Sequence, residues 1–453
     1  MTTPHAPLPA REIPWPPNVT IREFARDPLG LYERLHREHG DVFGVRMLGG
    51  LVRMVIVASP DGVEQVLARN QGAYVKPGIF LKIVRPLFGG GIFSSEGKAW
   101  KRKRRLLAPT FQRERLLDMG PAIVEATAAH VATWDTKDAD APRDILEELN
   151  GLTLRVASRV FFGTDLEKHA ATFGHALREA FACLGARLSG SPPLPLWVPT
   201  PGNRRLRRAR TTLRDLMRDI LATRRESGSE GDDLLGRLLA ARDEDGQAFG
   251  DNELIDEMIT LLIAGHDTSA AALSWTLRLL AEHPEVLARV HAEIDDVVGE
   301  RLPTVENVPS LRLTRQVFDE TLRLYPPAWG QPRKAIAEDV VDGFRLPRGM
   351  LVTTSQWLVH RHPTWWPDPE RFDPGRFDAE PSANRPRFAW FPFGGGARVC
   401  IGRQLALLEA PLILATILQS YTVRPSGPRP EPDPTFTLRP RGTLPLLLVP
   451  RDR

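Results

Sequence analysis

The amino-acid sequence predicts a mainly α-helical protein with small β-sheets, and three observations lead to this fold class. Apolar residues recur with helical periodicity over most of the chain. Two short runs rich in β-branched residues, Val52 to Val57 and Leu351 to Thr354, are typical of strands. The apolar segment Leu254 to Leu280 is long enough to form one central helix.

The neighbouring segments suggest where these elements end. Asp251 and Asn252 are candidate caps for the central helix, and His283-Pro284 should close it. The proline-rich segment Ser189 to Asn203 predicts an extended loop, either a connector or a lid. A second irregular stretch, His362 to Pro392, is too aromatic for a solvated linker, so we expect packed coil there.

Composition excludes several classes of protein. With 42% hydrophobic and 26% charged residues, the chain resembles an ordinary globular protein. Its net charge of +4 is too mild for a nucleic-acid binder of this size. Two cysteines, Cys183 and Cys400, leave no disulfide framework, and the proline-rich extension at residues 1–18 contains no apolar anchor. We therefore expect one cytoplasmic domain over residues 1–453, without nucleic acid or a membrane anchor.

A glycine-rich loop around the second cysteine carries the most chemical information. Residues 393–402 read FGGGARVCIG and lead into the apolar segment Leu405 to Leu418. A lone cysteine is usually a small buried hydrophobe, and a glycine run is usually a turn. Free amides and the dipole at a following helix start would instead stabilise a thiolate at Cys400. Arg398 could then pair with an anionic group on a large flat ligand.

This loop resembles the heme-binding signature of the cytochrome P-450 superfamily. Its five defined positions match Phe393, Gly396, Arg398, Cys400 and Gly402. The resemblance implies the cytochrome P-450 fold, with a long central helix over heme b (iron protoporphyrin IX). It makes Cys400 the axial iron ligand, packs Phe393 beside the sulfur and directs Arg398 to a heme propionate. A phosphate-binding loop is the rival interpretation, but no Gly-Lys-Ser/Thr follows the glycines.

The central helix contains an unusual AGHDT sequence at residues 264–268. Gly, Asp and Thr all lower helix propensity, although small residues also occur where two helices touch. The Thr268 hydroxyl can bond the Ala264 carbonyl four residues back and bend the helix, while Gly265 removes bulk beside the bend. The sequence resembles the family's oxygen-activation motif, which implies proton delivery by Asp267 and Thr268 and cofactor contact at Ala264 and Gly265. At the variable position, His266 is expected to pack against neighbouring helices.

An acidic and a basic residue three positions apart suggest a structural ion pair. Glu320 and Arg323 lie on one helix face, where most such pairs only decorate the surface. The segment resembles the family's Glu-x-x-Arg helix, which packs beneath the cysteine loop and uses a third arginine. Arg371 and Arg376 are both candidates, and the spacing to the cysteine loop favours Arg376.

A basic helix supplies further candidate contacts to the cofactor. Trp100 and Arg104 are one helical turn apart, and they resemble the family's Trp-x-x-x-Arg pair, which holds a propionate. Arg333 occupies the place of a third propionate contact in the family. Five consecutive basic residues, 101–105, would normally form a solvated face or a nucleic-acid patch; by the resemblance they would steer an acidic electron carrier.

The resemblance runs from Trp100 to Gly402 and implies a monooxygenase that inserts one atom of dioxygen into a hydrophobic substrate. A fatty acid, terpenoid, carotenoid or polyketide would suit a deep apolar pocket. Substrate selectivity would depend on Gln71 to Ser95, on Ser189 to Asn203 and on residues after Tyr325. The sequence shows no flavin or iron–sulfur segment, so we expect a ferredoxin or flavodoxin with an NAD(P)H-dependent reductase. A peroxide-using or isomerising enzyme and a heme-thiolate gas or redox sensor are the alternatives.

Overall fold

A computed structural model of the chain describes residues 10–134, 141–228, 231 and 233–451. The first half of the proline-rich extension expected at residues 1–18 therefore lies outside the described residues. The chain divides into two compact units, and the division falls between Cys400 and Ile401 near the end. The first unit comprises the residues up to Phe80, Ala328–Glu370 and Arg385–Cys400, and the second comprises the rest. A single catalytic domain stays a prediction.

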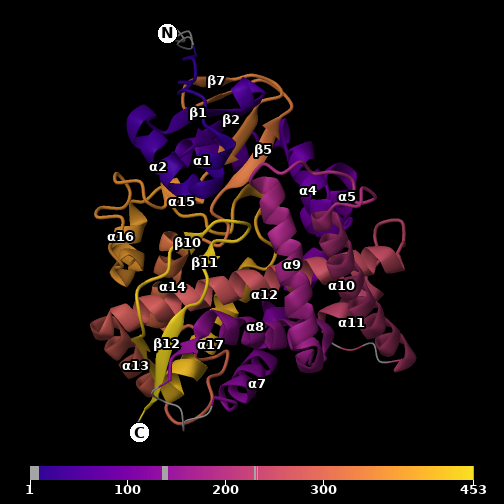
Figure 1. Cartoon of the computed structure of the whole chain (residues 1–453). Helices are drawn as coiled ribbons and strands as arrows, with labels where there is room; N and C mark the ends of the chain where they lie inside the picture. Colours follow the sequence, from indigo (N-terminus) through magenta and orange to yellow (C-terminus); the bar gives the residue numbers. More distant parts are fainter. Residues whose placement is uncertain (1–9, 135–140, 229–230, 232, 452–453) are drawn as a thin grey trace, which may run out of the picture. The chain divides into compact units, whose positions relative to one another are not determined.

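The first unit is built on a five-stranded sheet with the order β1-β2-β8-β5-β3. Both predicted strands have the predicted bounds, β2 at Val52–Val57 and β8 at Leu351–Thr354, and they pair in parallel. The last three residues of β2, Val55 to Val57, are fully buried, which explains the β-branched run at this end of the strand. The other strands are β1 (Val42–Met47), β3 (Tyr74–Val75) and β5 (Gln331–Ala335), with a separate hairpin of β6 (Asp339–Val341) and β7 (Phe344–Leu346). Figure 1 shows β1 and β2 side by side near β5.

Short helices flank this sheet. The helix α2 (Pro28–His39) begins with a proline after the cap Asp27, and it ends at Gly40, whose φ of 81° suits glycine. The remaining helices are α1 (Ile21–Arg26), α3 (Pro60–Glu64) and α15 (Gln356–Val359). The helix α4 (Gly78–Phe88) begins in the first unit and ends in the second.

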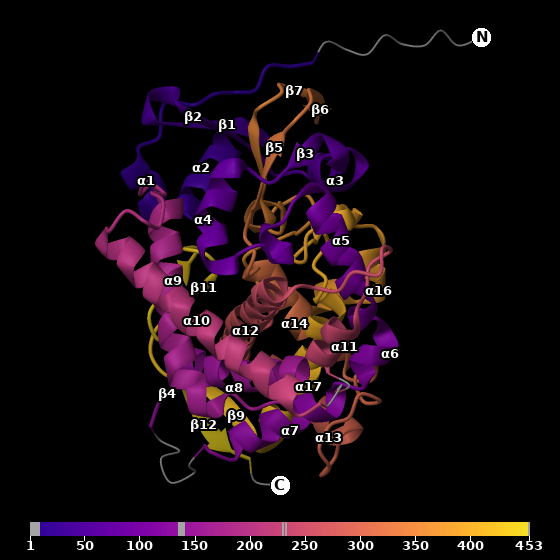
Figure 2. The ribbon, with the colours of Figure 1, turned by 90° about the vertical axis from the view of Figure 1, so that its right-hand side faces the viewer.

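The second unit is helical and is organised around α12 (Asp251–Glu282). This helix packs against α8 (Ile145–Phe162), α14 (Arg312–Leu324) and α17 (Arg403–Ser420), and Figures 1 and 2 show α8 beside it. The other helices are α5 (Gly97–Leu107), α6 (Arg113–Leu117), α7 (Gly120–Val131), α9 (Ala170–Leu188), α10 (Pro201–Glu226), α11 (Leu234–Ala240), α13 (Pro284–Val297) and α16 (Ala379–Ala383). Its strands are β4 (Arg143–Asp144), β9 (Tyr421–Pro425), β10 (Pro432–Asp433), β11 (Arg439–Pro440) and β12 (Pro445–Pro450). No helix of the described chain is both long and apolar enough to cross a bilayer.

The predicted central helix is confirmed, but its predicted cap is wrong. Asp251 and Asn252 are already helical, and Gly250 is the cap residue. The Glu253 carboxylate accepts a hydrogen bond from the Gly250 N–H at 3.2 Å, so the acid three residues into the helix satisfies this donor. The helix ends at Glu282, so His283-Pro284 closes it as predicted, and Pro284 is also the first residue of α13.

The two irregular segments are also as expected, with small differences. Coil connects α9 to α10, but the loop ends at Thr200 rather than Asn203, because Thr200 caps α10 and Pro201 occupies its first turn. The aromatic coil is well packed, with Trp366, Phe372, Phe388 and Phe391 buried. The short helix α16 within that coil was not predicted from the sequence.

Candidate functional site

The cysteine loop is held in place by its own backbone and by the first unit. The Cys400 N–H donates to the Phe393 carbonyl at 2.9 Å, and the Ala397 N–H donates to the Gln71 side-chain oxygen at 2.7 Å. Phe393 and Arg398 are half-buried, whereas Cys400 is exposed. The helix α17 begins at Arg403, with Gly402 as its cap residue. A glycine-rich loop that opens onto a helix is therefore confirmed.

One glycine of this loop is required by a close contact between two parts of the backbone. Gly396 has a φ of 64°, and a Cβ at this position would overlap the carbonyl oxygen of Leu67. Gly396 thus allows the loop to approach another part of the backbone, a reason that the sequence did not suggest. Between β8 and the loop, the described residues contain no strand, so the strand–loop–helix order of a phosphate-binding loop is missing.

In the second unit, α12 presents one uncovered face in the middle of a buried helix. From Glu257 to Ala281 every residue is buried except Ala264, which is exposed, and Gly265 and Thr268, which are half-buried. These three positions share one helix face. A face with so little side-chain bulk fits a large flat group such as heme.

The acid and the alcohol of the AGHDT sequence have defined partners. The Thr268 hydroxyl donates to the Ala264 carbonyl at 2.7 Å, as predicted. Asp267 is buried, and its carboxylate accepts a short hydrogen bond from the Thr437 hydroxyl and lies 3.9 Å from the Arg439 guanidinium. Burial raises the pKa of Asp267, while Arg439 and Thr437 partly counteract this effect. Asp267 can therefore carry a proton nearer to neutral pH than an exposed aspartate can.

The two remaining residues of the AGHDT sequence face neighbouring helices. His266 is buried as predicted, with its Nδ1 atom 2.9 Å from the Thr153 hydroxyl, and burial lowers its pKa to about 4. A Cβ at Gly265 would lie 2.9 Å from the Phe161 ring of α8. Gly265 therefore permits close packing of α8 on α12, which differs from the expectation that it removes bulk beside a bend.

The acid–base pair of α14 is fully buried. The Arg323 guanidinium donates to both oxygens of Glu320, at 2.7 and 2.8 Å, and neither side chain is exposed. The Arg376 Nε atom lies 3.5 Å from Glu320, whereas Arg371 contributes its backbone carbonyl to Arg323 at 3.2 Å. Arg376 rather than Arg371 thus brings its guanidinium to Glu320, in line with the expectation.

The basic run on α5 differs from the expectation of an open positive surface. Arg102 pairs with Asp243 at 2.6 Å, Lys103 is buried against Glu257 at 2.9 Å, and Arg105 forms an ion pair with Glu244. Arg102 and Lys103 are thus paired largely within the protein, whereas the Arg105–Glu244 pair is exposed. Trp100 and Arg104, on the same helix, are half-buried. Lys101 is exposed.

The predicted cofactor contacts are divided between the units. Phe393, Arg398, Cys400 and Arg333 belong to the first unit, where Arg333 is buried on β5 and donates to the Gln331 side chain at 3.3 Å. Trp100, Arg104, Gly402 and the AGHDT residues belong to the second unit.

Two features of the second unit were missed by the sequence reasoning. Glu409 on α17 is buried and accepts a hydrogen bond from the Ser269 hydroxyl at 2.5 Å; burial raises its pKa to about 7. Glu409 is the single acid in the apolar helix α17, and this pattern in the sequence could have indicated it.

The second feature is a cluster of four phenylalanines, with ring centroids 4.9 to 6.4 Å apart: Phe88, Phe93, Phe181 and Phe436. Phe436 is followed in the chain by Thr437, whose hydroxyl donates a hydrogen bond to Asp267, so the cluster is connected to this acid.

Comparisons with known proteins agree on one family. The family model described as cytochrome P-450 matches residues 8–447. Cyclooctat-9-en-7-ol 5-monooxygenase of Streptomyces melanosporofaciens is 38% identical over 91% of this chain and 89% of its own. Pentalenene oxygenase of Streptomyces avermitilis is 35% identical over 88% of each chain. A crystal structure of a cytochrome P-450 heme domain matches with a TM-score of 0.88 at 26% identity, over 98% of this chain and 99% of its own.

Proposed function

Because this chain belongs to the cytochrome P-450 family and is a heme-thiolate monooxygenase of hydrophobic compounds, we propose that its substrate is a terpenoid. Two similar enzymes are named for the oxidation of cyclooctat-9-en-7-ol and of pentalenene, both terpenoids. The observation that carries the proposal for this chain is the phenylalanine cluster. Phe88 and Phe181 are buried, so the half-buried Phe93 and Phe436 provide the apolar surface. Phe436 adjoins Thr437, the hydrogen-bond partner of Asp267, and such a surface suits a compact hydrocarbon without polar groups to satisfy.

We assign the cofactor contacts to the residues that match the family's motifs. Cys400 would ligate the iron, and Phe393 would pack beside the sulfur. The positive charges of Arg104, Arg333 and Arg398, with the Trp100 indole, would hold the propionates. Ala264 and Gly402 would leave room for the macrocycle, and Gly265, whose Cβ position faces Phe161, would offer it only backbone. When bound, heme supplies the redox chemistry that activates dioxygen and inserts one oxygen atom into a C–H bond.

The proton path is assigned to Asp267 and Thr268. The Thr268 hydroxyl donates to the Ala264 carbonyl, so its oxygen remains able to accept another hydrogen bond. Asp267 can release a proton and regain it, because burial raises its pKa while Thr437 and Arg439 stabilise the carboxylate. Together they would deliver protons into a site from which bulk water is excluded.

Removing the hydroxyl in Thr268→Ala is expected to uncouple electron use from product formation. We expect product per NAD(P)H to fall about tenfold while peroxide rises, and Asp267→Asn to slow turnover about a hundredfold. The matched control is Thr276→Ala, because Thr276 lies on the same helix and donates to the carbonyl four residues back at 2.8 Å. Unchanged coupling in Thr268→Ala, or equal uncoupling in the control, would refute the assignment.

Ligand titrations of the ferric enzyme test the substrate class. We expect pentalenene or a cyclic diterpene alcohol to shift the heme spin state at micromolar concentration, and a fatty acid or macrolide to leave it unchanged. Phe436→Ala should weaken terpenoid binding about tenfold, equivalent to about 1.4 kcal/mol. A spin-state shift with the fatty acid or macrolide alone would reject the terpenoid proposal.

Electrons must come from a separate redox partner, and we propose a ferredoxin or flavodoxin with an NAD(P)H-dependent reductase in the cytoplasm. The ion pairs of Arg102, Lys103 and Arg105 reduce the charge that α5 can offer to an acidic carrier. Lys101 remains exposed for this contact.

A further inference from the structure

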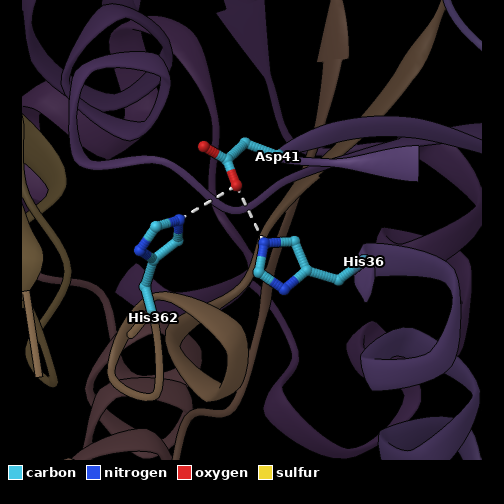
Figure 3. A group of neighbouring side chains, drawn as sticks. All are labelled: His36, Asp41 and His362. Atoms are coloured by element: carbon cyan, nitrogen blue, oxygen red, sulfur yellow. Dashed lines mark hydrogen bonds and ion pairs between the residues drawn. The ribbon is translucent and has the colours of Figure 1, made fainter. Parts of the chain in front are cut away.

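Three side chains of types that bind metals meet in the first unit, and none of them has been assigned a role above. His36 lies in the last turn of α2, Asp41 precedes β1, and His362 follows α15. The Nε2 atoms of His36 and His362 lie 2.8 and 3.1 Å from the same Asp41 oxygen (Figure 3). His362 is 321 positions from Asp41 in the chain, so the fold alone brings the three together.

We propose that His36, Asp41 and His362 form a binding site for a divalent transition metal, with Zn²⁺ as the expected ion. Two imidazoles and one carboxylate would provide three ligands, and water would complete a tetrahedral site. Nitrogen and oxygen donors of this kind suit zinc, while Ca²⁺ and Mg²⁺ prefer sites made of oxygen alone.

The spacing is close to what a zinc ion requires. Ligand atoms about 2.1 Å from a tetrahedral ion lie about 3.4 Å from each other. The two nitrogen–oxygen distances of 2.8 and 3.1 Å are only slightly shorter, and the three ligand atoms all lie within 4.8 Å of one another. Side-chain rotations that lengthen these two distances and set the separation of the two nitrogens would admit the ion.

Burial and charge also favour a metal. The two imidazoles are held in place, since their side chains are only 15% and 13% exposed and their rings lie 5.5 Å apart. The Asp41 side chain is 38% exposed, which leaves a path for the ion and its water. Both imidazoles face the same carboxylate oxygen of Asp41, so an ion bound between them would meet an acidic side chain.

The ion would replace the two imidazole–Asp41 hydrogen bonds, and one further hydrogen bond must change when it binds. The Thr364 N–H donates to Nδ1 of His362 at 3.2 Å, which places the imidazole proton on Nε2. Coordination through Nε2 moves that proton to Nδ1, so the Thr364 N–H has to turn to another acceptor. Thr364 is exposed, and water can take this role at small cost.

The ion would tie α2 and the start of β1 to the segment after α15. This role is independent of heme, substrate and redox partner, and it goes beyond the monooxygenase activity. Zinc should therefore stabilise the folded holoenzyme without changing the spectrum of its heme.

The test is zinc binding by the holoenzyme after treatment with a chelator and equilibration with Zn²⁺ alone. Zinc and iron are measured by mass spectrometry, and thermal unfolding is followed by circular dichroism. We expect one zinc per heme iron, micromolar or tighter affinity and a higher melting temperature with zinc. His36→Gln, Asp41→Asn and His362→Gln should each weaken binding at least about tenfold, the smallest effect that loss of even an outer-shell partner typically has.

The variants are chosen so that folding does not obscure the result. Glutamine keeps an N–H that can donate to Asp41, and asparagine keeps the shape of aspartate. His39→Gln is the matched control, because His39 is on the same helix turn but lies 3.7 Å from Glu38 instead. Loss of zinc in the three variants and retention in His39→Gln would support the site. Substoichiometric zinc in the wild type, or wild-type affinity in the three variants, would overturn it.

Discussion

Replacing Cys400 with serine is expected to abolish both the thiolate-type spectrum and substrate oxidation. A serine hydroxyl stays protonated near neutral pH and cannot donate electron density to iron as a thiolate does. We expect the strongly red-shifted Soret band of the reduced carbon monoxide complex to disappear. Without the thiolate, turnover should fall at least about a thousandfold, which corresponds to about 4 kcal/mol of additional activation barrier.

The second cysteine provides the control for this experiment. Cys183 is buried on α9, and its thiol donates to the Gly202 carbonyl at 3.3 Å, a bond that serine can replace. Burial raises the pKa of the Cys183 thiol, which makes it a poor thiolate. Cys183→Ser should therefore keep the spectrum and the activity. A thiolate spectrum that survives in Cys400→Ser would contradict the assignment of the iron ligand.

Glu320→Ala is expected to have the largest effect on stability. It leaves the fully buried Arg323 guanidinium without its carboxylate partner, and it also removes the acceptor of the Asp373 N–H at 2.9 Å. Breaking a buried ion pair in this way costs about 3–5 kcal/mol. We expect this loss in urea unfolding of the holoenzyme, or a failure to accumulate folded protein.

An exposed pair of the same chemistry is the matched control. Glu338 and Arg345 are 2.9 Å apart, with both side chains 55% exposed. Because water screens this pair, Glu338→Ala should change the free energy of unfolding by less than about 1 kcal/mol. Equal unfolding midpoints for the two variants would contradict the structural role of Glu320.

Features set by local spacing were predictable from the sequence. The strands β2 and β8 have the predicted bounds because their apolar β-branched runs are short and continuous. The bond from Thr268 to Ala264 follows from the four-residue repeat of a helix, and the Glu320–Arg323 pair follows from its three-residue spacing. The spacing within residues 393–402 was sufficient to indicate the family and its cofactor.

Contacts between distant segments were decided only by the tertiary structure. Thr437 reaches Asp267 across 170 positions, and acidic residues of other segments neutralise Arg102 and Lys103 on α5. Nothing near Asp267 in the sequence indicates such a partner. Ion pairs and hydrogen bonds of this kind form where packing brings side chains within a few ångströms. The sequence by itself determined the helix and strand types, the family and the cofactor, whereas the packed fold decided which charges are paired and which remain available.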